Sequence, residues 1–417
     1  MNKHLNNSIF TPILLAGSLI LLISFAIRST FGLFQIPIAD QFLWTRSEFS
    51  LAIAIQNLAW GIATPLFGAF AEKFGDRKTI LIGGIIYAIG LVFSSISSSP
   101  EAHQLLNILI GAGIAGTGFG PILAVVGRST SPEKRSLALG ITTAAGSAGQ
   151  VVGPPMAGFL LTFMSWPAVF LTFAFLIISS LLFLPFLKSN SSSSKDVNKE
   201  NLKDVLIYAI KDPSYLMLFF GFFSCGFQLA FITAHFPAFI AEASSPINQG
   251  SLISFVCNSV ASLGALSIAL IGLFNIIGTI TAGALGKYFT KKYLLSLIYL
   301  GRTIAAILFI IFPITPTSVV IFSIAMGALW LATVPLTSGL VGYIYGMRYM
   351  GTLYGIIFLS HQIGSFVGVW LGGLFYDVYG SYNLVWWVGI GVGAFSAIIH
   401  LPVNEIPYLE RQKTKIA

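Results

Sequence analysis

The sequence has few charged residues. Asp, Glu, Lys and Arg make up only 9% of its 417 residues, whereas 56% of the residues are hydrophobic. Soluble domains carry about 25% charged residues, so this chain cannot build a water-facing surface and a soluble globular fold is excluded. The hydrophobic residues recur in long runs, and a run of about 20 apolar residues is what a helix needs to cross a bilayer.

The sequence also lacks the motifs of common enzyme sites. Its two cysteines, Cys225 and Cys257, indicate neither a disulfide framework nor a metal site. It contains no phosphate-binding G-x-x-x-x-G-K-S/T loop, no Cys and His cluster at zinc spacing and no acid pair placed for hydrolysis. We therefore expect no enzyme, no catalytic residue, no cofactor and no metal, and an activity that ATP does not drive.

Twelve apolar segments are long enough to be transmembrane helices. Their many glycines suit close packing between helices in lipid. The expected helices are Thr11–Ile38, Ser47–Ala71, Thr79–Ser97, Leu105–Val126, Ser136–Leu161, Ala168–Leu187, Tyr215–Phe239, Ala261–Gly286, Tyr293–Phe312, Ser318–Tyr343, Gly351–Tyr376 and Tyr382–Pro402. The fold class is therefore predicted to be an all-α integral membrane protein.

The net charge of +8 follows from membrane topology and does not indicate a nucleic-acid partner. If both termini are inside, nineteen of the 22 Lys and Arg residues fall on the cytoplasmic face. Arg46 alone falls outside, and Arg28 and Arg302 lie within helices. An excess of Lys and Arg in cytoplasmic loops is the positive-inside pattern. We expect a multi-pass protein of the bacterial inner membrane with both termini in the cytoplasm.

A polar, low-complexity stretch at Lys188–Asp204 divides the twelve segments six and six, and it predicts a cytoplasmic linker. The expected domains are an N-terminal bundle (1–187), a linker (188–212) and a C-terminal bundle (213–417). The fifth and eleventh helices repeat one glycine pattern at an offset of 215 residues. Gly140, Gly149, Gly153 and Gly158 match Gly355, Gly364, Gly368 and Gly373.

The first and seventh helices align at an offset of 200 residues. This alignment pairs Arg28 with Gln228 and Gln35 with His235. Two parallel halves are the arrangement expected of a transporter that holds its substrate near the middle of the membrane. On this basis we expect the first, seventh and eleventh helices to line a shared central cavity.

The loop between the second and third helices carries a motif that returns in the second half. Its sequence, GAFAEKFGDRK, recurs in outline as GALGKYFTKK between the eighth and ninth helices. This loop resembles the signature of the major facilitator superfamily, and the resemblance extends over nearly the whole chain. It implies twelve transmembrane helices in two pseudo-symmetric six-helix bundles. It also implies a set of cytoplasmic gating residues, namely Gly68, Glu72, Lys73, Gly75, Arg77 and Lys78.

Several segments resemble the monocarboxylate and oxalate-formate transporter branch of that superfamily and its bacterial relatives. They include WTRSEFSLA, CGFQLAFITAHFPAF and GLFNIIGT. The resemblance implies a small organic anion as substrate. Arg28 is the nearest counterpart of the functional lysine in the first helix of monocarboxylate carriers, and His361 of the lysine in the eleventh helix of oxalate-formate carriers. The Asp and Arg pair of the eighth helix is missing, and only Asn275 stands there.

The charges expected inside the membrane are all positive. All fourteen acidic residues lie in loops or at helix ends, which leaves Arg28 and Arg302. An intramembrane charge costs several kcal/mol and is usually kept for function, so the unpaired positive field favours an anion. Arg28 shares a helical face with Gly32 and Gln35 at spacings of four and seven, and its planar fork suits a carboxylate. The alternative for either arginine is a structural bond to nearby carbonyl groups.

Other polar residues extend the predicted site. Gln228 and His235 share one face of the seventh helix, and Tyr354 and His361 share one face of the eleventh. Histidine titrates near physiological pH, so either imidazole could couple proton and anion movement; a plain hydrogen bond to a carbonyl is the alternative. The residues predicted to bind substrate are Arg28, Gln35, Asn57, Gln228, His235, Arg302, Tyr354 and His361.

These features predict a secondary active transporter that moves a small organic anion, a monocarboxylate, by alternating access. The expected partners are this anion, protons and membrane lipid, without nucleic acid, and we expect a monomer. Efflux of a drug or secreted metabolite is the alternative with the same fold, and the Gly153-Pro154-Pro155 motif is its support. A membrane sensor would require a signalling domain, whereas the longest soluble stretch is the linker.

The distribution of basic residues makes a testable prediction about topology. Reporter enzymes fused after Ala417 and within Lys188–Asp204 should both be active only in the cytoplasm, because lysine-rich segments are retained there. Alkaline phosphatase, which requires the periplasm, is the matched probe at the same two positions. Phosphatase activity at either position would refute the predicted topology.

Overall fold

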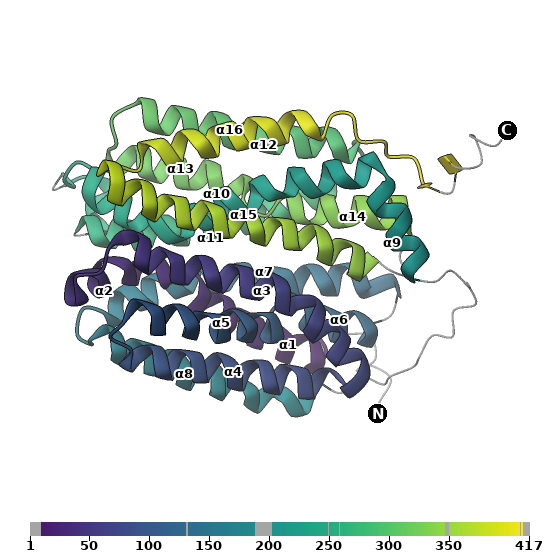
Figure 1. Cartoon of the computed structure of the whole chain (residues 1–417), viewed down its shortest axis with the longest axis horizontal. Helices are drawn as coiled ribbons and strands as arrows, with labels where there is room; N and C mark the ends of the chain where they lie inside the picture. Colours follow the sequence, from purple (N-terminus) through teal and green to yellow (C-terminus); the bar gives the residue numbers. More distant parts are fainter. Residues whose placement is uncertain are drawn as a thin grey trace. The chain divides into compact units, whose positions relative to one another are not determined.

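The computed structural model describes residues 10–130, 132–187, 202–248, 250–257, 259–346, 350–408 and 410–411. All regular secondary structure within these residues is helical. The chain divides into two compact units, Met1–Ser194 and Lys195–Ala417. In Figure 1 the helices of the first unit are purple to blue, and those of the second unit are teal to yellow. The predicted linker falls largely on residues 188–201, which lie outside the described residues.

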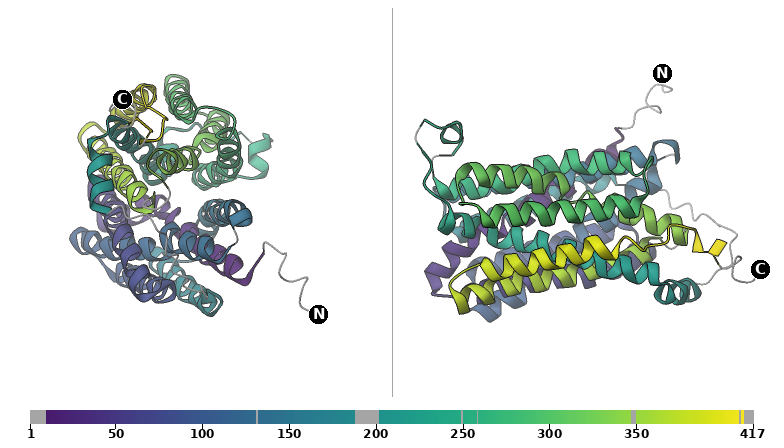
Figure 2. Two further views of the ribbon diagram at one scale, coloured as in Figure 1. Left: turned by 90° about the vertical axis from the view of Figure 1, so that its right-hand side faces the viewer. Right: turned by 90° about the horizontal axis from the view of Figure 1, so that it is seen from above.

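The helices of the first unit run side by side, as the end-on view in Figure 2 shows. They are α1 (Pro12–Arg28), η2 (Phe31–Phe34), α2 (Gln35–Phe42), α3 (Arg46–Phe74), α4 (Asp76–Ile96), α5 (Pro100–Thr117), α6 (Phe119–Ser129), α7 (Pro132–Leu160), α8 (Trp166–Ser180) and η3 (Leu181–Phe186). The tightest packing joins α1 to α7, and α5 to both α3 and α4.

The second unit has a corresponding set of helices, preceded by one short helix. They are α9 (Leu202–Lys211), α10 (Pro213–Ala243), η4 (Leu252–Phe255), α11 (Val260–Leu285), α12 (Lys291–Ile311), α13 (Pro316–Leu329), α14 (Thr333–Tyr345), α15 (Met350–Tyr379) and α16 (Asn383–Ile399). Here α10 packs closely on α15, and α11 packs on α13. These two contacts correspond to the pairing of α1 with α7 and of α3 with α5.

Polar side chains fix where many helices begin. Thr11 accepts a hydrogen bond from the backbone N–H of Leu14, and Pro12 follows as the first residue of α1. Thr45 and Glu48 form a capping box at the start of α3. Such side chains satisfy backbone N–H groups that the first helical turn leaves free.

Ten helices or helix pairs within the described residues are long and apolar enough to cross a membrane. They are Pro12–Phe42, Arg46–Gly68, Asp76–Ile96, Pro100–Ser129, Trp166–Phe186, Pro213–Ala243, Val260–Leu285, Lys291–Ile311, Pro316–Tyr345 and Thr352–Tyr379. Two further helices are α7, which has 29 residues, and the shorter apolar α16, which has 17. The predicted all-α membrane fold with twelve helices is confirmed.

Within the described residues, three of the predicted helices are interrupted, and another, Ala168–Leu187, changes from α8 to the 3₁₀ helix η3 at Leu181. The first ends at Arg28 and resumes through a 3₁₀ turn at Phe31–Phe34. The fourth changes from α5 to α6 at Gly118, and the tenth changes from α13 to α14 between Trp330 and Ala332. The prediction of one continuous helix through Arg28 is therefore wrong. Helical spacings of four and seven do not carry across the break, so Gly32 and Gln35 are not placed on a helical face with Arg28.

Two of the four repeated glycines in each half lie where two helix backbones touch. A Cβ atom added at Gly149 or Gly153 of α7 would lie 2.3 or 2.1 Å from the carbonyl oxygen of Leu22 or Ala26 of α1. Only glycine permits this approach.

The second unit repeats this contact. A Cβ atom at Gly364 or Gly368 of α15 would lie 2.1 or 2.4 Å from the carbonyl oxygen of Phe223 or Phe227 of α10. The two crossings therefore match at the predicted offset of 215 for the glycines. The contacted carbonyls of α1 and α10, however, are 201 residues apart, as Leu22 is from Phe223 and Ala26 from Phe227. The predicted alignment of Arg28 with Gln228 at an offset of 200 is therefore wrong by one residue.

Alanine substitution at these glycines tests the crossings. Gly153→Ala and Gly368→Ala should destabilise the purified protein by about 1–3 kcal/mol, because overpacking forces the helices apart. Their matched controls are Gly140→Ala and Gly355→Ala on the same helices, where an added Cβ would meet no atom within 4 Å. The controls should be neutral or stabilising by up to about 1 kcal/mol. Thermal unfolding measures both, and equal effects at crossing and control positions would contradict the packing.

Candidate functional site

Arg28 is the last residue of α1 and lies beside α3. Its Nη2 donates to Oδ1 of Asn57 at 3.4 Å. Its guanidinium lies 4.6 Å from the centre of the Trp60 ring and 5.9 Å from that of Phe25. Both rings are almost fully buried. The aromatic faces attract the cation, and the carbonyl end of α1 contributes partial negative charge.

The guanidinium of Arg28 keeps donors that the protein does not use. The bond to Asn57 is its single hydrogen bond to the described residues, and none of their carboxylates forms an ion pair with it. Arg28 is only partly buried, and none of its nitrogens is a buried atom without a partner. The unused donors therefore face accessible space, where an anion can bind them in the bidentate manner that arginine favours.

Asn57 and Gln35 differ in their relation to Arg28. Asn57 lies on α3, is 3% exposed and donates through Nδ2 to the carbonyl oxygen of Ile53 at 2.9 Å. This bond turns the amide oxygen of Asn57 toward the arginine. Gln35 begins α2 beyond the break and is fully buried. The structure thus brings Asn57 to Arg28 and places Gln35 on the next α-helix.

Arg302 is bound in a different way. It lies on α12 with no exposed surface, and it donates from Nε and Nη2 to the carbonyl oxygen of Leu329 at 2.9 and 2.6 Å. Nη2 also donates to the carbonyl oxygen of Trp330. These carbonyls end α13, where a helix carries about half a negative charge. Arg302 therefore neutralises and caps the broken tenth helix.

Asn275 supports the same break from α11. Its Oδ1 accepts from the backbone N–H of Leu331 at 2.9 Å and from Oγ1 of Thr279 at 3.0 Å. Asn275 is fully buried. Together Arg302 and Asn275 satisfy backbone acceptors and a donor that the change from α13 to α14 leaves unpaired. A helix interior in lipid tolerates such a break only when neighbouring helices re-satisfy its backbone groups.

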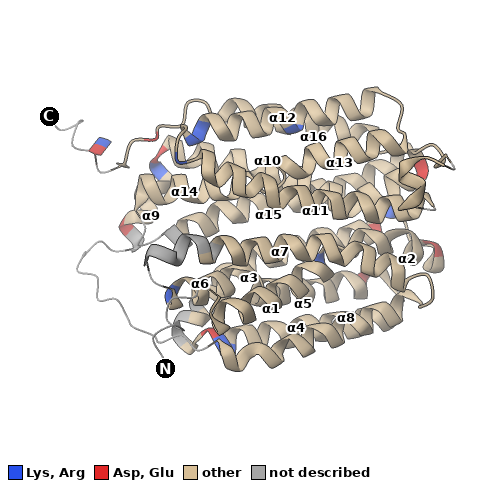
Figure 3. Cartoon of the chain, turned by 180° about the vertical axis from the view of Figure 1, so that it is seen from behind, with Lys and Arg blue, Asp and Glu red and all other residues tan. Residues whose placement is uncertain are grey.

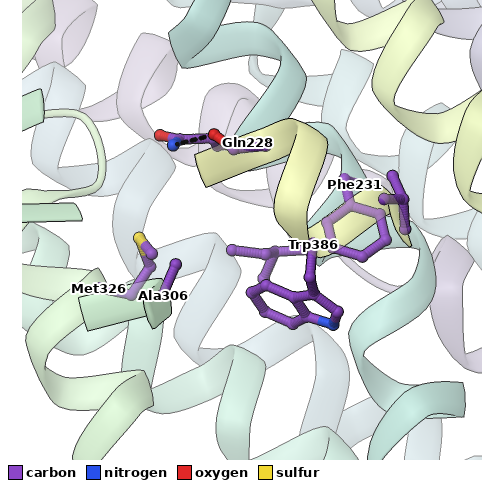
Figure 4. Close-up of a pocket in the computed structure, with 8 residues that line it drawn as sticks. Gln228, Phe231, Ala306, Met326 and Trp386 are labelled. Atoms are coloured by element: carbon purple, nitrogen blue, oxygen red, sulfur yellow. Dashed lines mark hydrogen bonds between the residues drawn. The ribbon is translucent and has the colours of Figure 1, made fainter. Parts of the chain in front are cut away.

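Gln228 lines a small cavity inside the second unit. Its Nε2 donates to the carbonyl oxygen of Gly389 at 3.0 Å, while its Oε1 has no partner among the described residues. Phe231, Ala306, Met326 and Trp386 complete most of the lining (Figure 4). The cavity offers about 10 Å³ to the centre of a water molecule. That space holds about one water, so the cavity is too small for an organic anion.

His235 is committed to hydrogen bonds within the second unit. Its Nε2 lies 2.8 Å from the carbonyl oxygen of Val369, and its Nδ1 lies 3.4 Å from the hydroxyl of Tyr382. The side chain has no exposed surface. A close contact with α15 also holds the ring, because a Cβ atom at Gly372 would lie 2.6 Å from it. This arrangement matches the alternative in which His235 bonds a carbonyl.

His361 and Tyr354 lie on α15, as their spacing on one helical face suggests. The ring of His361 stacks on Phe358 at 5.4 Å and approaches Phe222 of α10 at 5.1 Å. Its Nδ1 is buried and has no partner among the described residues. Tyr354 is partly buried, with its ring 6.1 Å from that of Phe222. Of the two predicted histidines, His361 therefore keeps a nitrogen for a further partner.

The predicted gating loop joins α3 to α4. Gly75 has φ of 91°, a conformation that side chains rarely adopt and that lets α3 end directly before α4. Arg77 donates from Nε to the carbonyl oxygen of Leu187 at 3.2 Å and from Nη2 to that of Pro185. Gly68 lies on α3, where an added Cβ atom would meet no atom within 4 Å, and Lys78 is exposed. The side chains of Glu72 and Lys73 lie outside the described residues.

An acid of this loop has a role that the sequence did not predict. Asp76, buried in the first turn of α4, forms an ion pair with Arg128 in the last turn of α6. Each charge sits at the helix end that it stabilises. The position of Asp76 directly after Gly75 is the sequence feature that could have indicated this role. Figure 3 shows that charged residues elsewhere also gather at helix ends and leave the helix interiors nearly uncharged.

Comparison with known proteins identifies the family. The model of the Major Facilitator Superfamily matches residues 17–368. The chain belongs to the major facilitator superfamily. It is thus a membrane transporter of small molecules and not an enzyme, and the predicted family is confirmed. Within the described residues of this facilitator, no group of three His, Cys, Asp or Glu side chains is placed to hold a metal ion.

Several relatives of this facilitator align along most of its length. The uncharacterized MFS-type transporter YcxA of Bacillus subtilis (strain 168) is 28% identical over 407 residues, which are 93% of this chain and 92% of that protein. Monocarboxylate transporter 13 of Bos taurus is 24% identical, covering 86% of this chain and 81% of that one. A crystal structure of a D-xylose-proton symporter matches with a TM-score of 0.72 at 15% identity, covering 95% and 98%. At 15% identity, the similarity to the symporter concerns the fold alone.

Removal of Arg302 should destabilise this facilitator more than removal of Arg28. Arg302→Met leaves two buried carbonyls without their side-chain donors, at a cost of about 1–3 kcal/mol each. Arg28→Met is the matched control, and it breaks one long hydrogen bond at 3.4 Å. Thermal unfolding of the purified proteins measures the difference. A larger loss of stability for Arg28→Met would contradict the structural role of Arg302.

Proposed function

We propose that this facilitator is a secondary active transporter of a small organic anion, a monocarboxylate, which it moves by alternating access. The observation that carries the proposal is the state of Arg28. It is a cation within an apolar span, its guanidinium makes one hydrogen bond to the described residues, and it retains accessible surface. Such a charge is costly in lipid unless a partner neutralises it.

The contrast between the two intramembrane arginines supports this assignment. Arg302 has its charge compensated by the end of α13 and has no exposed surface. It has the features of a structural residue. Arg28 differs in that it is only partly buried, and its unused donors reach accessible space beside the Trp60 and Phe25 rings. A carboxylate offers two acceptor oxygens in the plane that such a fork requires.

The relatives add independent support for a carboxylate. Monocarboxylate transporter 13 aligns over most of this chain, and its name states the class of substrate that it carries. Asn57 beside Arg28 supplies an amide that can hold the arginine in position while the anion binds. We assign Arg28 and Asn57 to the anion site and place them on the first unit. We further propose an inner-membrane location and cytoplasmic termini, as the basic loops predict.

His361 is the proposed proton carrier. Its Nδ1 has no partner among the described residues, whereas both nitrogens of His235 lie near an oxygen. An imidazole in this state can take up a proton without losing an existing bond. Proton and anion would then move together with little net charge transfer.

Substitution of Arg28 tests the proposed anion site. In whole cells or liposomes, Arg28→Gln should lower uptake of radiolabelled small monocarboxylates by at least about tenfold, because a neutral amide cannot replace the charged fork. Arg28→Lys should keep partial uptake, since the charge remains without the fork. Arg302→Lys, which retains the cation at the end of α13, is the control and should transport normally. Normal uptake by well-expressed Arg28→Gln protein would refute the proposal.

A further inference from the structure

The helix α14 is bounded by two unusual structures. At its start, the chain between Trp330 and Ala332 interrupts the tenth helix. Arg302 and Asn275 form hydrogen bonds with the backbone groups that this break leaves without a helical partner. At its end, Gly346 adopts φ of 85°, which terminates the helix directly after Tyr345. The helix is therefore a separate segment of 13 residues, with the break at one end and Gly346 at the other.

The far end of α14 is tied to α10 through one carboxylate. Asp212 caps α10, because its Oδ1 accepts from the backbone N–H of Ser214 at 3.0 Å. Its Oδ2 accepts from the hydroxyl of Tyr345 at 2.6 Å. Arg411 completes the group with a bidentate ion pair, in which Nη1 reaches Oδ1 at 3.2 Å and Nη2 reaches Oδ2 at 2.6 Å. The side chain of Asp212 is only 3% exposed.

The segment that carries Arg411 is itself docked on the second unit. The Tyr408 ring stacks on Tyr208 of α9 at 5.5 Å, and the guanidinium of Arg411 lies 5.5 Å from the Tyr408 ring. Glu405 accepts from the backbone N–H of Lys292 at the start of α12, at 2.5 Å. The C-terminal segment thus reaches α9, α10, α12 and α14. It contacts all four near their ends.

The ion pair is charged at physiological pH. Burial alone would raise the pKa of the Asp212 carboxyl, but hydrogen bonds from Arg411, Tyr345 and the Ser214 backbone outweigh it and lower that pKa. The contribution of the Asp212 carboxylate to the stability of the folded protein is fully present above the pKa of about 4 that the group has in the unfolded chain. This contribution is lost only as the pH falls through the lower pKa of the folded state. The contact is therefore closed at neutral pH, and a change of position rather than a change of protonation must open it.

We propose that the Asp212, Tyr345 and Arg411 contact is a latch by which the C-terminal segment holds α14 closed, and that its release lets α14 swing about the break at Trp330–Ala332. The latch gives the C-terminal segment control over the movement of one membrane helix. A partner or modification that draws Arg411 away would free α14. The inference does not depend on which substrate binds at Arg28.

Hydrogen exchange measured by mass spectrometry tests the latch on the full-length protein in lipid nanodiscs, without added substrate. Arg411→Gln should speed exchange in peptides from Thr333–Tyr345 by about tenfold, equivalent to about 1.4 kcal/mol. Peptides from Pro316–Leu329, on the other side of the break, should be unchanged. Asp212→Asn should act in the same way, because asparagine keeps the helix cap while it loses the charge.

Two controls separate the latch from a general loss of stability. Lys413→Gln removes a positive charge from the same terminal segment and should leave exchange as in the wild type. Tyr345→Phe removes one bond to Asp212 and should speed exchange in α14 by a smaller factor. The latch is overturned if Arg411→Gln leaves exchange in α14 unchanged, or if it speeds exchange in α13 and α14 equally.

Discussion

The cost of an arginine charge in lipid, without a carboxylate beside it, governs much of this structure. Insertion scales put the cost at about 2.5–3.5 kcal/mol at the centre of a helix. For Arg302 the protein supplies the missing negative charge from within, as the carbonyl end of α13. For Arg28 it supplies aromatic faces, one amide and the end of α1. A bound anion would complete this second set and would turn a structural cost into a step of transport.

The interrupted helices follow from the same constraint. A break in a membrane helix exposes backbone groups that lipid cannot satisfy, so each break needs polar side chains from a neighbouring helix. Arg302 and Asn275 perform this task from α12 and α11. Elsewhere the backbones are continuous and approach closely, and glycine provides the space, as at Gly153 and Gly368. Both units therefore contain close glycine crossings, and the second unit also contains a break that neighbouring helices support.

The sequence predicted the elements that depend on local composition, and missed those that depend on distant partners. Apolar length predicted the spans, and the abundance of glycine predicted close packing between helices, although not which pairs of helices cross. The break after Arg28 has no proline to mark it, and the break at Trp330 is bonded by Arg302, which lies 28 residues earlier in the sequence. The pair of Asp212 and Arg411 joins residues 199 positions apart, which no spacing rule can connect. The substrate-binding residues were predicted as one set, but their contacts separate Arg28 and His361 from Arg302 and His235.

The central claim is that Arg28 binds a carboxylate directly, and a thermal-shift titration of the purified protein tests it most closely. A ligand that binds only the folded state raises its stability by mass action. Small monocarboxylates should raise the unfolding temperature of the wild-type protein and of Arg302→Lys, and leave that of Arg28→Gln unchanged. Stabilisation of Arg28→Gln to the same extent as the wild type, or no response of the wild type to any carboxylate, would contradict the account.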